Sequence, residues 1–504
     1  MPDTHPNPAP TTLDCAWLLS DPGSTPPQAN TRITLASGLV STVAALPQPV
    51  AGPRQLVLPA LANAHDHGRT FRSATLGSQD LPLEGWLPYQ GLVPGADPYL
   101  CAATSFARSV RRGVAHLMVH YTRVQGGMPF VEEGLAVVRA ARDVGVRIGF
   151  AVALRDRNGL GLCDDATMLA ALRPEIRDEV ARRMAVRGLP PAQQVALVEE
   201  LAASVQQDDS LAQHMTVQYG PTGVQWCSQP LLEAIAQGSA DHQRPVHMHL
   251  LETPYQRQWA DHAYPKGIVH YLDQIGLLSP RLTLAHCVHA RSDELALLAE
   301  RGVTIAVNTS SNLALKSGIA PLAEMLRQGC RVAMGLDGAG PDEDDDALRE
   351  MRLAYTLQRG WGFAEDMTRT QLWTFAARNG RRSVSADTHP LGGTIAPGAP
   401  ADLVVLNWDA LDDDALFDNI DPLDLLLARA NGSHIDQVIV GGRTVVRRGQ
   451  LTTLDEPALR AELLAQVRSR IAAQADLSPW RATVDAFVED LGPFYRRSAW
   501  AGCC

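Results

Sequence analysis

Eight short apolar runs, most of them separated by helix-like segments, dominate the middle of this 504-residue chain. Each run has the length of one buried strand, and segments such as residues 131–144, 292–301 and 321–328 carry apolar residues at helical spacing. Strands that alternate with helices form parallel sheets, and eight such units over about 330 residues favour an α/β fold of the (β/α)8 TIM-like barrel type, with insertions. The eight predicted strands are residues 56–62, 114–120, 147–154, 215–219, 246–251, 282–285, 303–307 and 332–335.

An open, doubly wound sheet would also alternate strands with helices. That alternative predicts a glycine-rich phosphate loop after the first strand, and none follows the run that ends at residue 62. Polar and reactive residues instead stand at the carboxyl ends of several runs, which is where barrel enzymes keep their active sites. The barrel is therefore the prediction.

Both ends of the chain have the texture of short strands. Residues 31–35 and 39–46 precede the barrel, and residues 401–407 and 437–446 follow it, with a Gly-Gly hairpin signal at 441–442. We expect the two ends to pair into one small β-sandwich domain. The predicted parts are residues 1–57 and 391–455 for the small domain, 58–390 for the barrel, and 456–504 for a C-terminal helix and tail.

Composition narrows the class of protein. The formal net charge of −11 argues against a nucleic-acid surface, and no apolar stretch approaches the length of a membrane span. Residues 1–27 are polar and proline-rich, unlike a secretory signal, and the eight cysteines form no CxxC pair. We expect a cytoplasmic protein that acts on a small molecule, with neither a nucleic-acid nor a membrane partner.

Two histidines one residue apart follow the first apolar run. In an extended strand, side chains alternate between faces, so His65 and His67 point the same way while Asp66 points the other. Two imidazoles on one face at a strand end can hold one metal ion. The pair alone is weak evidence, because such pairs also arise by chance at strand exits.

Three further runs end in residues of the same kind. His249 closes the fifth run with Glu252 three residues on, His286 closes the sixth, and Asp337 follows the eighth. A barrel gathers these strand ends into a small circle, so the set predicts one metal-containing active site. His247, which shares a face with His249, is expected to be a packed interior residue.

Seven sequence motifs lie within residues 39 to 449, the extent of a resemblance to a known family. They are NAHDH (63–67), DLPLEGWL (80–87), HLLET (249–253), HCVH (286–289), SSNLALKSGIAP (310–321), GLDG (335–338) and GAPADLVVL (398–406). Together they resemble the amidohydrolase superfamily. The resemblance is to its mononuclear aminohydrolase branch, which contains guanine deaminase, adenosylhomocysteine deaminase and the triazine chlorohydrolases.

The resemblance implies a metal held by His65, His67, His249 and Asp337, with a water in the open position. Three imidazoles and a carboxylate suit Zn²⁺ or Fe²⁺, and Zn²⁺ is the preferred expectation. The pKa of the bound water would fall from roughly 15.7 towards about 7. Asp337 would accept a proton from that water as it attacks an sp² carbon.

The resemblance also implies roles for the two remaining polar residues. Glu252 would protonate a ring or amidine nitrogen and then carry a proton to the leaving amine. His286 would polarise the attacked group or stabilise the developing charge.

The lysines decide the metal count. Binuclear relatives bridge two metals with a carboxylated lysine on a central strand, and the only lysines here are Lys266 and Lys316. Lys266 lies in a helical connection and Lys316 in a loop, so neither can bridge, and one divalent ion is expected. Relatives are often dimers, which makes a homodimer possible.

Four residues are candidates for substrate contacts. Arg69 could meet an anionic or carbonyl-rich substrate, or be a solvated loop arginine, and Trp86 could cover the pocket or anchor a loop. Tyr219 and Gln225 follow the fourth run. Deaminase relatives often carry a histidine two residues before a proline in this segment. Tyr219 takes its place, which weakens the case for a purine or adenosyl substrate.

The first functional hypothesis is therefore a metal-dependent aminohydrolase that removes an amine from a nitrogen heterocycle or amidine by C–N hydrolysis. An alternative keeps the site but hydrolyses a cyclic amide, or displaces a halide from an aromatic ring, because the same activated water would attack. A non-catalytic scaffold is the third hypothesis. It predicts broken metal ligands, and all four are present.

Overall fold

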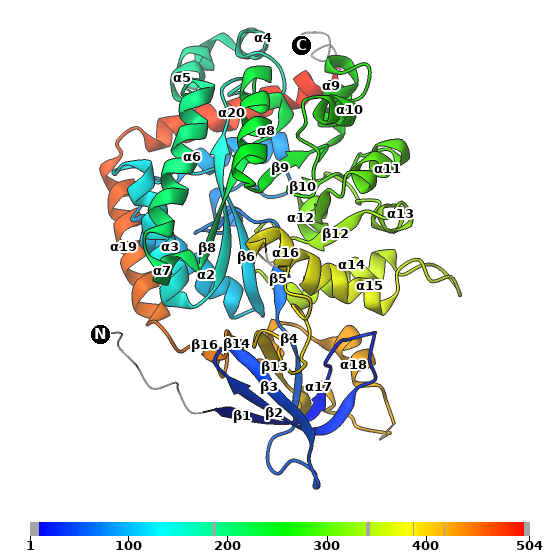
Figure 1. The fold of residues 1–504 in the computed structure, drawn as a ribbon. Helices are drawn as coiled ribbons and strands as arrows, with labels where there is room; N and C mark the ends of the chain where they lie inside the picture. Colours follow the sequence, from blue (N-terminus) through cyan, green and yellow to red (C-terminus); the bar gives the residue numbers. More distant parts are fainter. Residues whose placement is uncertain (1–9, 185–187, 339–342, 387, 418, 498–504) are drawn as a thin grey trace.

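The computed structural model describes residues 10–184, 188–338, 343–386, 388–417 and 419–497. Two eight-stranded sheets organise it, one forming the barrel and one lying beneath it (Figure 1). The helices are α1 (Leu83–Trp86), α2 (Pro98–Val110), α3 (Phe130–Val144), α4 (Asp165–Ala171), α5 (Pro174–Met184), α6 (Pro191–Gln206), α7 (Asp209–Ala212), α8 (Gln229–His242), α9 (Pro254–Ala263), α10 (Ile268–Gln274), α11 (Ser292–Glu300), α12 (Thr309–Ala314), α13 (Leu322–Arg327), α14 (Ala347–Gln358), α15 (Arg369–Trp373), α16 (Asn379–Ser385), α17 (Trp408–Leu411), α18 (Pro422–Arg429), α19 (Glu456–Ala473) and α20 (Leu477–Arg496), with short helical turns η1 (Ser73–Leu76), η2 (Leu87–Leu92), η3 (Val224–Trp226), η4 (Thr374–Arg378) and η5 (Gly432–His434).

The barrel sheet is parallel throughout. Its strands run in sequence order, and the amide of Ala64 donates to the carbonyl of Met334 at 2.7 Å, which joins the last strand to the end of the first. The predicted TIM-like barrel is confirmed. The strands are β5 (Leu61–Asn63), β6 (Val114–Tyr121), β7 (Arg147–Leu154), β8 (Met215–Pro221), β9 (Val246–Leu250), β10 (Leu282–His286), β11 (Thr304–Val307) and β12 (Arg331–Met334).

The barrel strands are apolar on both faces because helices cover the outside and side chains fill the inside. All eight residues of β6 are buried, for example. At the lower end of the barrel, Gln218 of β8 donates to the carbonyls of Ser383 and Val384 in α16. Helix α16 therefore plugs that end, and the opposite end remains for the active site.

The second sheet combines both ends of the chain, as predicted. Strands from the N-terminal segment pair with strands from the C-terminal segment through β4 and β13, which are antiparallel. The boundaries of the four predicted parts of the chain stay a prediction. In spatial order the sheet runs β16 (Gln450–Leu451), β15 (Arg443–Arg447), β14 (Ile435–Val440), β13 (Leu403–Asn407), β4 (Gln55–Pro59), β1 (Thr11–Leu18), β2 (Gln28–Ala36) and β3 (Leu39–Ala45).

The predicted strand at residues 56–62 is wrong in one respect, because it is two strands in two different sheets. Strand β4 pairs with β13 as far as Pro59, and the amide of Ala60 still bonds to Asp402. From Leu61 the chain pairs with β6 of the barrel instead. The run is apolar and buried throughout, so its hydrophobic pattern carries no mark of the transfer.

The C-terminal segment contains the predicted helix at residues 456–473, observed as α19. The expected tail is a second helix, α20, which crosses the end of the barrel opposite the small sheet (Figure 1, red). Among the described residues, no helix has the length and hydropathy that a membrane crossing requires.

Candidate active site

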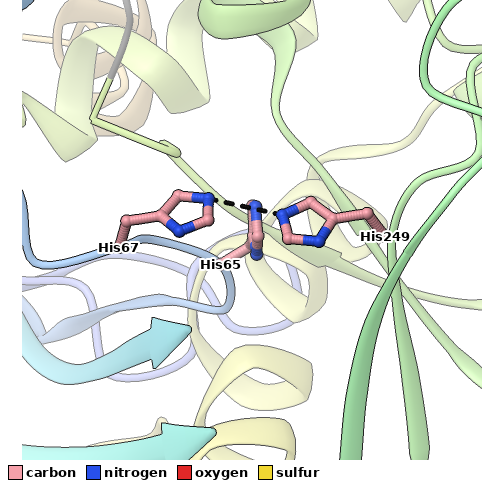
Figure 2. Close-up of side chains that lie close together, drawn as sticks. All are labelled: His65, His67 and His249. Atoms are coloured by element: carbon pink, nitrogen blue, oxygen red, sulfur yellow. Dashed lines mark hydrogen bonds between the residues drawn. The ribbon is translucent and has the colours of Figure 1, made fainter. Parts of the chain in front are cut away.

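The predicted polar residues converge at the upper end of the barrel. His65 and His67 follow β5, His249 lies in β9, His286 ends β10 and Asp337 follows β12. The ligand atoms of His65, His67 and His249 lie within 4.8 Å of one another, and so do those of His65, His286 and Asp337. Figure 2 shows His67 and His249 reaching towards each other with His65 between them.

The outer nitrogens of two of these rings fix their tautomers. His67 Nδ1 lies 2.8 Å from the carbonyl of His120, and His249 Nδ1 lies 2.7 Å from the carbonyl of Thr222. A carbonyl oxygen can only accept, so each Nδ1 must carry a hydrogen. Burial, more than any neighbouring charge, lowers the pKa of both imidazoles, which keeps them neutral.

The inner nitrogens of the same two rings then face each other as lone pairs. His67 Nε2 and His249 Nε2 are 3.3 Å apart, the contact drawn as a dashed line in Figure 2. Two unprotonated nitrogens at this distance repel each other unless a positive charge lies between them. A tetrahedral Zn²⁺ site with bonds of about 2.0–2.1 Å separates its ligands by about 3.3 Å.

The other two predicted ligands have matching positions. His65 Nδ1 bonds to His247 Nε2 at 2.8 Å, while the buried His65 Nε2 has no hydrogen-bond partner among the described residues. Asp337 Oδ1 lies 3.5 Å from His65 Nε2 and 3.2 Å from His67 Nε2. The donors thus fit one divalent cation. His247, expected to be a packed interior residue, also orients His65.

Asp337 is held from several sides. Its backbone has a left-handed φ of +59°, and its amide donates to the carbonyl of His65 at 2.8 Å. Ser311 donates to Oδ2 at 2.6 Å, and Arg69 donates to Oδ1 at 3.3 Å and to the main-chain carbonyl. Burial opposes ionisation of Asp337, but the positive charge of Arg69, the largest influence that favours the carboxylate, helps to bring the pKa of Asp337 well below the ordinary value.

Glu252 and His286 lie beside this group. Glu252 Oε2 is 3.6 Å from His286 Nε2, and His286 Nδ1 bonds to Asn312 Oδ1 at 2.8 Å. Burial, together with the charges of Asp337 and Glu84, raises the pKa of Glu252 well above that of an ordinary glutamate. Burial therefore favours the protonated form of Glu252, which can act as an acid.

A cavity of about 830 Å³ opens above these residues. His67, His249, Glu252, His286 and Asp337 all reach its floor. Its walls are rich in aromatic side chains from several segments: Phe71, Trp86, Phe106, Tyr121, Trp226, Trp480 and Tyr495.

Two of the four predicted substrate contacts line this cavity. The Arg69 guanidinium lies 4.7 Å above the ring of Trp86, a cation–π contact. Trp86 is in turn held by a 3.1 Å hydrogen bond from its Nε1 to Ser73. Arg69 is therefore no solvated loop residue, because its side chain is tied to Asp337 and covered by Trp86.

The structure places the side chains of Tyr219 and Gln225, the other two predicted contacts, away from the cavity. Tyr219 is buried and points out of the barrel, where its hydroxyl donates to Glu199 of α6 at 2.5 Å. Its neighbour Gln218 occupies the inner face, so strand alternation sends Tyr219 outwards. Gln225 is buried in η3 and is absent from the cavity wall formed by the described residues.

Two residues in or near the motifs were missed. Thr222, one residue beyond β8, faces the cavity and gives His249 its carbonyl partner. Glu84 of α1 lines the cavity and accepts a 2.6 Å hydrogen bond from Thr253, and burial raises its pKa to about 7. The signal for Glu84 was its place in DLPLEGWL, two residues before Trp86.

Comparison with known proteins gives relatives of one kind. The chain is 29% identical over 438 residues to the 5'-deoxyadenosine deaminase of Methanothermobacter thermautotrophicus, which covers 85% of the chain and 89% of the relative. It is 28% identical over 434 residues to the 8-oxoguanine deaminase of Pseudomonas aeruginosa, covering 83% and 88%.

The solved structures include the atrazine chlorohydrolase of Arthrobacter aurescens in complex with zinc and atraton. It matches with a TM-score of 0.73 at 20% identity, over 90% of this chain and 99% of its own, which is a likeness of fold. The model of the amidohydrolase family matches residues 56–445, which include all eight barrel strands and part of the small sheet. The chain therefore belongs to the amidohydrolase family.

Proposed function

We propose that this protein is a metal-dependent aminohydrolase that deaminates a nitrogen heterocycle or amidine by hydrolysis of a C–N bond. One observation carries the proposal: the lone pairs of His67 and His249 oppose each other at 3.3 Å beside Asp337, with a protonated Glu252 within reach of the same floor. That arrangement combines a cation site with a proton donor, which are the two requirements of hydrolytic deamination.

One divalent ion, Zn²⁺ in preference to Fe²⁺, is the proposed cofactor. His65, His67, His249 and Asp337 would hold it, and it would make a water nucleophilic at neutral pH. A single ion is supported by the two lysines, because Lys316 pairs with Asp80 at 2.8 Å and Lys266 is exposed between α9 and α10.

The protein side chains would move the protons. Asp337, whose ionised form is favoured by the charge of Arg69, would take a proton from the attacking water. Glu252, whose protonated form is favoured by burial, would give its proton to the ring nitrogen next to the attacked carbon. As a carboxylate it would then take the proton of the new hydroxyl group and deliver it to the departing amine, and the proton held by Asp337 would restore the acid form of Glu252. His286, steadied by Asn312, would stabilise the developing charge.

Purines belong among the proposed substrates. The argument against them depended on Tyr219 at the pocket, and Tyr219 points away from it. Relatives act on 5'-deoxyadenosine and 8-oxoguanine according to their names, and the cavity of about 830 Å³ is large enough for a nucleoside. Arg69 and Trp86 are the proposed contacts of the substrate beside Asp337.

The test is ammonia release by zinc-loaded protein from a panel of purines, adenosine derivatives, pterins, aminopyrimidines and triazines. We expect turnover of at least one purine compound, and none by chelator-treated protein before zinc is restored. Mass spectrometry of the product separates loss of an amine from ring opening or loss of halide, the two outcomes of the alternative hypothesis. Absence of amine release across the panel would contradict the proposal.

The proposal also includes a cytoplasmic location and a homodimer. The net charge of −11 and the absence of a spanning helix among the described residues support a protein that works on dissolved small molecules. Light scattering of the purified protein tests the dimer, and a mass near 54.4 kDa would contradict it.

A further inference from the structure

Helix α20 is the part of the cavity wall that the family match does not include. The match ends at residue 445, whereas α20 spans Leu477–Arg496. One face of the helix is buried, with residues at the four- and three-residue spacing of an amphipathic helix. The buried residues are Trp480, Val484, Phe487, Leu491 and Tyr495.

Side-chain contacts hold α20 against residues 73–92, the segment that follows β5. Tyr89 of η2 donates from its hydroxyl to Asp485 at 2.8 Å. Arg481 donates to the carbonyl of Leu76 at 2.8 Å, and Val488 packs against Gly85 of α1.

A second set of contacts pins α20 to α5. Arg173, next to the start of α5, forms a forked ion pair with Asp490 at 2.8 Å, and Arg183 pairs with Asp476. The Arg183 guanidinium also lies 4.9 Å above the ring of Trp480. Because both partner segments line the cavity, α20 bridges two insertions that rise above the barrel.

Two aromatic residues of α20 reach the cavity itself. Trp480 is 5% exposed and packs with Tyr89 and Leu92, and Tyr495 is 3% exposed with its ring 4.9 Å from that of Tyr255. Tight packing holds both rings in place, so they act as a rigid limit of the cavity. Leu160 and Leu162 line the cavity near Tyr495, and Leu76 and Met184 near Trp480, so apolar side chains surround both rings. Arg183 also lines this part, and its charge is paired with Glu179 and Asp476.

We infer that α20 is a specificity element, and that Trp480 and Tyr495 recognise the part of the substrate that projects away from the metal site. The inference rests on the proposed function. A single heterocycle would fill a small part of about 830 Å³, so the remaining space fits a substituent. Apolar walls with aromatic rings select an apolar or flat substituent. The substrate class is thus a purine amine of nucleoside size whose distal end is apolar.

The experiment measures discrimination between a large and a small substrate. The kcat/KM of zinc-loaded protein is determined for 5'-methylthioadenosine and for adenine, in the wild type, Trp480→Leu and Tyr495→Leu. We expect each variant to lower the ratio of the two values about tenfold or more, with adenine little affected and zinc content unchanged.

Val484→Ala is the matched control, because Val484 packs on the same helix face without lining the cavity formed by the described residues. It should lower the thermal midpoint like the two test variants and leave the ratio unchanged. A ratio that changes equally in all three variants, or in none, would overturn the inference and leave α20 a structural helix.

Calorimetry separates this inference from the proposed function. Binding of 5'-methylthioadenosine and of adenine to zinc-loaded protein needs no turnover. If no ammonia is released, the proposed function fails, and preferential binding of the larger compound that disappears in Trp480→Leu still supports the specificity element. Equal binding of that compound by the wild type and both variants would refute it.

Discussion

The floor of the cavity (His67, His249, Glu252, His286 and Asp337) and its upper wall (residues 73–92, α5 and α20) are built differently. Each floor residue lies at or within a few residues of a strand end, and main-chain carbonyls at the ends of neighbouring strands hold His67 and His249. The upper wall is held by side-chain pairs between segments far apart in sequence, such as Arg173 and Asp490. Barrel geometry thus fixes the chemistry, whereas the shape of the site depends on replaceable segments.

Loss of a floor ligand should have the largest effect. In His249→Ala the donor set loses one imidazole, so we expect zinc content near zero and ammonia release lower by about 10³-fold or more. Elemental analysis measures the zinc content, and the ammonia assay measures the activity. Trp480→Leu, a change in the upper wall, should retain its zinc. If His249→Ala kept its zinc, the assigned floor would be wrong.

Glu252→Gln should separate proton transfer from metal binding within the floor. The amide is nearly the same shape but cannot supply the acid proton, so we expect kcat to fall by about 10²–10⁴-fold. Zinc content should equal that of the wild type, because Glu252 is outside the proposed ligand set. If Glu252→Gln kept its activity within about tenfold of the wild type, Glu252 would not be the acid.

Glu84 lies where the floor meets the upper wall, and its carboxyl should make stability depend on pH. The pKa of Glu84 is about 7 in the folded protein, against an ordinary value of 4.5, so the folded state binds more protons between these values and stability falls as pH rises. The full loss, reached above pH 7, is about 3 kcal/mol. Glu84→Gln should abolish it while keeping a partner for Thr253.

The measurement is the unfolding midpoint of wild type and Glu84→Gln at pH 5 and pH 8. The variant should gain stability relative to the wild type at pH 8 and gain little at pH 5. Parallel curves for the two proteins would mean that Glu84 ionises freely in the folded state.

The smallest effect should come from the ion pairs of the upper wall. Arg173→Ala removes the forked pair with Asp490, a partly exposed contact of modest strength. We expect a change of about twofold in the 5'-methylthioadenosine to adenine ratio, with zinc and adenine turnover unchanged. Arg301→Ala is the control, because its pair with Asp273 joins α10 to the end of α11 away from the cavity. Equal changes of this ratio in Arg173→Ala and Arg301→Ala would show that the upper wall does not discriminate between the two substrates.

The floor could be predicted because its signal is local. In a barrel, a polar residue at the carboxyl end of an apolar run lies at the active-site end, and His65, His249 and Asp337 lie there. Tyr219 failed because β8 extends to Pro221, so the residue that turns into the cavity is Thr222. The predicted strand ended at residue 219, two residues short of the observed end, and alternation from the inward-facing Gln218 directs Tyr219 outwards.

The upper wall could not be predicted in the same way. The spacing of Trp480, Phe487 and Tyr495 is present in the sequence and indicates an amphipathic helix. What that helix covers depends on α5 and η2, which lie hundreds of residues earlier, and on pairs such as Tyr89 with Asp485. Periodicity reports a buried face but not the surface that buries it.

The passage from β4 to β5 through the single residue Ala60 has a consequence for how the molecule could be divided. The segment that leads to His65 begins in the small sheet. There β4 pairs with β1 on one side and with β13 on the other. A barrel produced without that sheet would lose the strand pairing that holds the start of its first strand in place. The small sheet therefore has to be kept together with the barrel in any chimaera or domain exchange.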